Sequence, residues 1–170
     1  MRNELQTFMI EWERETDGTL ALLRALPIDQ YDHRSDPGAR SIGELAWHLA
    51  EVDAYTTLGI EQREFRFPVK PAHIERPRTI EALAPAFRVV HEDAVARISR
   101  LRDNDLDREI TYADGQPWST RSLLWRKLLL HSVHHRGQLA LLCRMAGGVP
   151  PGLFGRTREE TSARQVAVAR

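Results

Sequence analysis

Hydrophobic residues recur at helical spacing along most of the chain. In residues 4–26 the apolar side chains fall on one face of a helix, and Pro27 ends the run. Ser41, with Glu44 three positions later, forms a capping box that begins a second amphipathic segment, which extends over residues 41–58. The pattern therefore predicts two helices in the first third of the chain.

Two further helices are predicted in the rest of the chain. A heptad-like apolar stripe runs from Leu83 to Leu101, with the helix expected to end near Arg102, and Pro85 indicates a kink or a late start. Ser119 or Thr120 caps the last of the four helices, which continues to about Met145. Because this last segment is apolar nearly all round, we expect it to be the central helix.

The connections between these helices differ in character. Residues 61–77, with Pro68, Pro71 and Pro77, form the longest irregular connection, and long loops often border a site. Residues 109–115 contain a short β-prone run followed by Asp-Gly, which predicts a turn or a short hairpin before the last helix. No third strand is available to make a sheet.

These elements predict an all-α fold, a four-helix bundle. With 170 residues, of which 42% are hydrophobic and 28% charged, the chain has enough apolar material for one core. We expect residues 1–160 to form a single domain. The polar tail, residues 161–170, is expected to be frayed.

Charge and cysteine content narrow the function classes. Lys+Arg 24 balances Asp+Glu 24, so no overall field favours nucleic acid or anionic lipid as a partner. Cys143 is the only cysteine, which excludes an intrachain disulfide and fits a reducing compartment. The sequence shows neither a signal peptide nor an apolar run long enough to span a membrane, so we expect a cytoplasmic protein.

The candidate chemistry lies in the histidines. His131 and His135 stand four residues apart on the last predicted helix, so both can direct a ring nitrogen at one ion. Spacing alone leaves packing as an equal alternative, and it also leaves His134 open as the second ligand. His48 borders the apolar stripe of the second helix, where a lone histidine is more often a hydrogen-bonded core residue. Three inward-facing histidines favour a metal site.

Other residues receive simpler interpretations. Glu44 and Tyr55 lie one turn before and two turns after His48, and either could orient a ligand, although a solvated Glu and a core-edge Tyr are the favoured readings. Cys143 is interpreted as a small core residue. The remaining histidines lack ligand-like spacing and are assigned to the surface or its boundary: His33, His73 and His91.

Known metal-site patterns exclude two kinds of centre. Position 132 is Ser, so the H-E-x-x-H arrangement of zinc proteases, with its adjacent general base, is absent. A repeated Glu-x-x-His, which a di-iron carboxylate bundle needs, is also absent. A mononuclear site remains.

Three separated segments carry a resemblance to a known family. They are Ser-Ile-Gly-Glu-Leu-Ala-Trp-His-Leu (residues 41–49), His-Ser-Val-His-His-Arg-Gly-Gln-Leu (131–139) and Val-Pro-Pro-Gly-Leu-Phe-Gly (149–155). Together they resemble the DinB/YfiT family over roughly residues 4–160. In that family one histidine of the second helix and an H-x-x-x-H pair of the last bundle helix bind a divalent metal. The resemblance places these ligands at His48, His131 and His135, and makes His134 a neighbour.

The resemblance implies a metal-dependent protein. Three histidines leave a coordination position open for water or substrate, which is typical of catalytic zinc sites. Zinc or nickel is the expected ion, although iron and other divalent ions also accept imidazole. Family members include metal-dependent hydrolases and transferases that use a low-molecular-weight thiol, so a small molecule or such a thiol is the expected partner. Relatives are often homodimers, and we expect the same here.

Two function classes follow from these observations. The leading hypothesis is a metal-dependent enzyme, a hydrolase or a thiol-dependent transferase, in which the ion activates water or a thiol. The alternative is a non-enzymatic, stress-associated binding or scaffold protein whose metal only ties two helices together. No residue stands out as a general base, and the substrate is not evident from the sequence.

Overall fold

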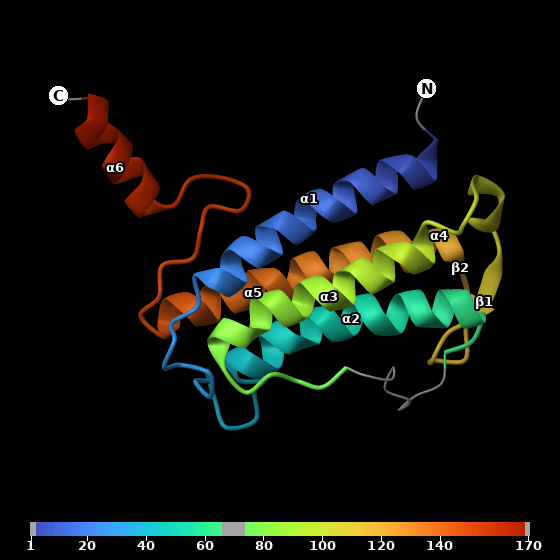
Figure 1. The fold of residues 1–170 in the computed structure, drawn as a ribbon, viewed down its shortest axis with the longest axis horizontal. Coiled ribbons are helices and arrows are strands. Elements are labelled where there is room, and N and C mark those ends of the chain that lie inside the picture. Colours follow the sequence, from blue (N-terminus) through green and yellow to red (C-terminus); the bar gives the residue numbers. More distant parts are fainter. Residues whose placement is uncertain (1–2, 66–73, 169–170) are drawn as a thin grey trace.

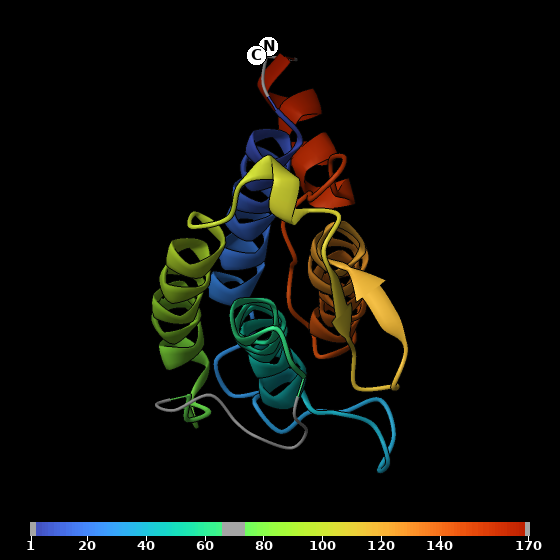
Figure 2. The ribbon, with the colours of Figure 1, turned by 90° about the vertical axis from the view of Figure 1, so that its right-hand side faces the viewer.

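The four predicted long helices form a bundle. The computed structural model describes residues 3–65 and 74–168. The bundle helices, seen lengthwise in Figure 1 and end-on in Figure 2, are α1 (Glu4–Arg24), α2 (Ile42–Gln62), α3 (Ile80–Ile98) and α5 (His131–Met145). The all-α four-helix prediction is therefore confirmed. Pro68, Pro71 and His73 of the longest irregular connection lie outside the described residues.

Side chains cap the first two helices. Asn3 precedes α1, and its side chain accepts a hydrogen bond from the Gln6 backbone N–H at 2.9 Å. At α2 the predicted capping box is present, since Ser41 Oγ accepts from Glu44 N–H at 3.3 Å while Glu44 accepts from Ser41 N–H at 2.9 Å. The helix continues one turn past the expected end, until Arg63 adopts a left-handed conformation with φ of 59°.

The third helix begins earlier than the apolar stripe suggests. α3 starts at Ile80, so Pro85 lies inside the helix, near its beginning, and the expectation of a late start is not met. Pro85 is the sixth residue of α3, past the first four N–H groups that lack partners within a helix, so it removes one internal hydrogen bond, the one that would reach the Glu81 carbonyl.

The last helix is composite. It comprises α4 (Thr120–Ser122), a π-helical segment called η2 (Leu123–Leu130), and α5. Ser119 caps it by accepting a hydrogen bond from Ser122 N–H at 3.2 Å, and Met145 ends it as predicted.

This composite helix is not the central element, contrary to the expectation from its composition. Leu130, Leu141 and Met145 are 58%, 64% and 53% exposed, so one side of the helix faces outward. α2 is the central helix instead, because it packs against α3, α5 and η2 and buries residues on most of its surface. Composition alone could not distinguish an apolar helix covered all round from one that leaves a leucine face open.

The short β-prone segment forms the expected hairpin. β1 (Glu109–Thr111) pairs antiparallel with β2 (Pro117–Ser119), with Ile110 opposite Trp118. The turn closes through the Tyr112 backbone N–H, which donates to the Gln116 carbonyl at 2.9 Å. Gly115 in this turn has φ of 77°, a conformation that glycine adopts without strain. The hairpin covers one end of the bundle (Figure 1).

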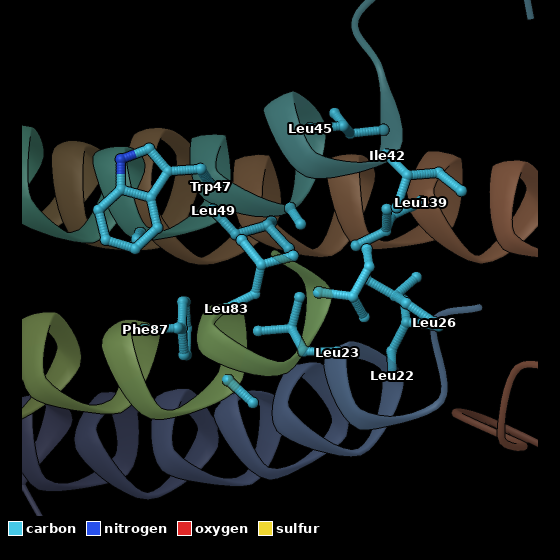
Figure 3. Close-up of a cluster of buried hydrophobic side chains, with 14 of the residues drawn as sticks. Leu22, Leu23, Leu26, Ile42, Leu45, Trp47, Leu49, Leu83, Phe87 and Leu139 are labelled. Carbon is cyan, nitrogen blue, oxygen red and sulfur yellow. The ribbon is translucent and has the colours of Figure 1, made fainter. Parts of the chain in front are cut away.

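Two apolar clusters fill the bundle. The first joins the end of α1 to the first half of α2, the first half of α3 and the end of α5 (Figure 3). The second lies toward the hairpin and contains large side chains that include Phe8, Trp12, Leu123, Leu124 and Leu128. Burial of these side chains supplies most of the stabilisation, at ~1.5–3 kcal/mol for each large one.

A buried polar network lies where the two clusters meet. His91 of α3 is 2% exposed, so its assignment to the surface or boundary was wrong. Its Nδ1 lies 2.7 Å from Asp53 Oδ2 of α2, and its Nε2 lies 3.1 Å from Glu13 Oε2 of α1. Two carboxylates from neighbouring helices provide the imidazole with the partners that burial requires. The periodicity of α3 alone could not show that these partners exist.

The C-terminal segment lies outside the bundle. α6 (Arg158–Val168) projects away from the four-helix core (Figure 1). This helix includes most of the tail that was expected to be frayed, and fraying of residues 161–170 stays a prediction. That residues 1–160 form a single domain also stays a prediction. None of the described helices combines the length and the hydropathy that crossing a membrane would require.

Candidate metal centre

Three histidines from two helices converge on one side of the bundle. His48 of α2 and the pair His131 and His135 of α5 each offer a ring nitrogen, and these nitrogens all lie within 4.8 Å of one another. The His131 and His135 Nε2 atoms are 2.7 Å apart, and the His48 ring centroid lies 4.6 Å from that of His135. These residues, called here the histidine triad, are the ones at which the resemblance places the metal ligands.

The composite helix positions two members of the triad. His131 and His135 are separated by one α-helical turn, which places both rings on one face of α5. The π-helical segment η2 ends at Leu130, directly before His131. Because a π-helical turn holds more residues than an α-helical turn, η2 changes the angular position of every later residue relative to α4. Such segments recur at functional sites.

Each triad imidazole has a second partner that orients it. His48 Nδ1 lies 3.4 Å from Glu51 Oε2, and His135 Nδ1 lies 2.7 Å from Gln138 Oε1. The backbone of Lys127 accepts a hydrogen bond from the His131 ring. When Nδ1–H donates to an oxygen, Nε2 retains its lone pair, so His48 and His135 are held in the tautomer that metal coordination requires.

The protein environment favours neutral imidazoles at the triad. Burial, together with nearby imidazoles, lowers the pKa of His131, and burial lowers the pKa of His135 to about 4. Both rings are half-buried, and His48 is 18% exposed. Neutral imidazoles are the form that binds a metal, and protons compete weakly for nitrogens whose pKa is low. The residues therefore fit a divalent ion.

The fourth candidate histidine lies outside the triad. His134 is exposed, and its ring packs against His135 with centroids 5.1 Å apart. Its nitrogens do not join the group of converging donors. The alternative that spacing left open, with His134 as the second ligand, is therefore not the arrangement in this structure.

The orienting residues were not found by sequence reasoning. Glu51 and Gln138 each lie three positions after a triad histidine, and this i, i+3 spacing was the available signal. Glu44 instead completes the helix cap and pairs with Arg34 and Arg76, at 3.4 and 3.3 Å, so its carboxylate is engaged away from the triad. The reading of Glu44 as a residue away from the site is supported.

A cavity opens beside the triad. Its volume is about 310 Å³, and it reaches from His48 and His131 along α2 to the hairpin. Two phenol rings line it, those of Tyr55 and Tyr112, and burial raises the pKa of both. The cavity also contains the carboxylate of Glu51. A small molecule in this space would contact the open side of the triad.

The fold and the triad together define a class of protein, a helical bundle in which histidines from two helices converge. The chain belongs to the DinB superfamily, whose family model matches residues 11–139. It is 29% identical over 164 residues to the protein YrdA of Bacillus subtilis, covering 94% of this chain and 93% of the relative.

Solved structures agree with this assignment. A DinB-like protein from Bacillus cereus is similar with a TM-score of 0.67 and 27% identity, covering 85% of this chain and 94% of that one. The fold is also shared with the DinB-like protein YjoA of Bacillus subtilis, with a TM-score of 0.67 and 22% identity over 83% of this chain and 92% of that one.

Proposed function

We propose that this protein is a metal-dependent enzyme in which His48, His131 and His135 hold one divalent ion, zinc or nickel. The observation that carries the proposal is the convergence of three imidazole nitrogens within 4.8 Å. No fourth His, Cys, Asp or Glu of the described segments joins this group. A three-ligand set leaves a coordination position for water, a thiol or a substrate atom, as in catalytic zinc sites.

The chain's own residues would prepare this position. Glu51 and Gln138 hold two rings in the ligand tautomer, and the Lys127 carbonyl holds the third. The triad rings are themselves largely covered, with His48 18% exposed, which limits the access of bulk water. A bound divalent ion supplies a Lewis acid that lowers the pKa of a water or thiol at the open position.

Hydrolysis and thiol-dependent transfer both need this open position, and a small-molecule substrate or a low-molecular-weight thiol fits the adjoining cavity. A scaffold protein with a purely structural metal would instead need a closed set of four protein ligands. The difference between the two functions is therefore a difference in coordination, which can be measured directly.

The test uses the full chain loaded with Co²⁺ in place of the native ion. Addition of 2-mercaptoethanol should produce a thiolate-to-cobalt charge-transfer band, because the thiolate can occupy the open position. His131→Ala should lose cobalt binding and therefore the band, whereas the neighbouring His134→Ala should retain both. Cobalt that binds to the wild type but gives no thiolate band would indicate a closed structural site and contradict the enzyme proposal.

A further inference from the structure

A second cavity lies on the other side of the triad. Its volume is about 300 Å³, and its walls include Leu45, Leu141 and Met145. Gln138, which holds the His135 ring, also lines it. The surface is therefore hollowed on both sides of the triad, with an apolar wall toward the end of α5 and two phenols toward the hairpin.

Arg40 is the residue that lines both cavities. It lies in the connection before α2, and its side chain is exposed. Together with His48 and His131 it lines the cavity of about 310 Å³, so Arg40 borders the same space as the triad. An arginine at the junction of two cavities can contact a ligand that extends into either one.

Within the described parts of the chain, no salt bridge or hydrogen bond engages the Arg40 side chain. Other cationic groups near the triad are engaged. Arg34 pairs with Glu44 at 3.4 Å, and Lys127 lies over the rings of Tyr112 and Trp118, at 4.6 and 4.4 Å. Among the described cationic residues that lie near the triad, Arg40 is therefore the one whose binding capacity is left for a ligand.

The carboxylate in the same cavity does not neutralise Arg40. Glu51 lies 3.4 Å from His48 Nδ1, and that contact orients the ring. With a divalent ion at the triad, the cavity would hold the charge of the ion and of Arg40 against one carboxylate. Such a site attracts anions, and a guanidinium binds carboxylate or sulfonate oxygens through paired N–H donors.

We propose that Arg40 is a specificity-determining residue that binds an oxyanion group of the substrate while another atom of the substrate occupies the open position at the triad. The inference rests on the proposed metal centre and names its substrate class as a small anionic molecule. Arg40 contacts the substrate away from the reacting atom, so its effect should depend on the anionic group and not on the ligand atom.

The experiment compares three thiols as ligands of the Co²⁺-loaded protein, followed by the thiolate-to-cobalt band. 2-Mercaptoethanol carries no charge beyond the thiol, 3-mercaptopropionate carries a carboxylate, and 2-mercaptoethanesulfonate carries a sulfonate. Arg40→Gln should weaken the binding of the carboxylate thiol by about tenfold, the effect of losing one charge-assisted contact. Binding of 2-mercaptoethanol should not change. Because each thiol is compared between variants, differences in thiol acidity cancel.

Two variants complete the design. Arg40→Lys should recover part of the lost affinity, since it keeps the charge without the planar pair of donors. Arg14→Gln, which removes an arginine that is 76% exposed on α1, should leave all three affinities unchanged. The sulfonate thiol shows whether the site accepts oxyanions in general or carboxylates alone.

Each outcome separates the two proposals. Equal losses for charged and uncharged thiols in Arg40→Gln, or no loss for either anion, would overturn the role of Arg40 and leave the metal centre intact. Absence of cobalt binding in the wild type would overturn the metal centre, and cobalt that binds without any thiolate band would overturn its open position; either result would overturn the role of Arg40 as well. Selective loss for an anionic thiol would support both.

Discussion

Replacement of Asp53 by Asn tests whether the buried network in the middle of the bundle stabilises the fold. Asp53 and His91 are each 2% exposed, and their side chains are 2.7 Å apart. Thr16 Oγ1 lies 3.4 Å from His91 Nδ1, the nitrogen that contacts Asp53, and Trp12 packs edge-on against the His91 ring with centroids 4.7 Å apart. Water cannot enter this buried setting in place of the Asp53 carboxylate. The Asn amide would therefore leave the His91 imidazole without the negative charge of Asp53.

The expected loss follows from the chemistry of the pair. Removing one partner of a buried charged pair costs about 3–5 kcal/mol. Asn can still accept a hydrogen bond, and Glu13 still lies 3.1 Å from His91 Nε2, so we expect about 2–3 kcal/mol for Asp53→Asn. For a chain of this length, that loss lowers the Tm by about 4–12 °C.

The loss should depend on pH in a defined direction. Burial alone would lower the pKa of His91, but the hydrogen bonds and charges of Asp53 and Glu13 outweigh it and raise the pKa above its usual value. The stabilisation is therefore complete below the unfolded pKa of about 6.5 and is lost as the pH rises through the higher native pKa. The loss in free energy of unfolding caused by Asp53→Asn should be largest near pH 6 and smaller near pH 9, because about one proton, that of His91, is released over this range.

Urea unfolding followed by circular dichroism at both pH values measures this penalty. Asp93→Asn is the matched control, because Asp93 lies two residues after His91 on α3 and is exposed. The control should change the free energy of unfolding by less than about 0.5 kcal/mol. An Asp53→Asn penalty as small as that of the control, or one that grows toward alkaline pH, would refute the reasoning.

Three further predictions concern the site and the surface. Glu51→Gln and Gln138→Ala should each weaken metal affinity by about 10–100-fold in a calorimetric titration, because the ligand rings lose their orienting partners; unchanged affinity would show that packing alone orients them. Cys143 is fully buried, and burial raises its pKa, so a thiol reagent should not label it in the folded protein; rapid labelling would contradict this. The homodimer expected from the resemblance should give twice 19.5 kDa by light scattering at micromolar concentration, and a mass of 19.5 kDa would reject it.

Much of the fold was predictable because it depends on local patterns. Apolar periodicity, the Ser41 capping box and the Asp-Gly turn of residues 114–115 each act over a few positions, and each appears where the sequence places it. The prediction of which helix is central was wrong, because burial depends on the neighbours that a helix has in space. The composite helix leaves Leu130 and Leu141 exposed, while α2 is covered on most sides. Its π-helical segment has no pattern that periodicity detects.

The site, too, was predictable from the sequence only where it depends on local spacing. The i, i+4 pair of His131 and His135 was visible in the sequence, but its connection to His48 required the resemblance, since the two helices are far apart in the chain. His91 was misassigned because its partners lie 38 and 78 positions away, on two other helices. A single sequence does not show which distant residues contact each other, so a buried histidine that is paired with carboxylates cannot be distinguished in it from a surface histidine.

The measurement that tests the central claim most directly is the metal content of untagged protein and of its histidine variants. The wild type should bind about one divalent ion per chain, and His48→Ala, His131→Ala and His135→Ala should each lose it, because two ligands are too few to retain the ion. His134→Ala, the neighbouring control, should bind normally, and all variants should remain helical by circular dichroism. Metal retained by the three ligand variants, or lost only in His134→Ala, would contradict the assignment of the site.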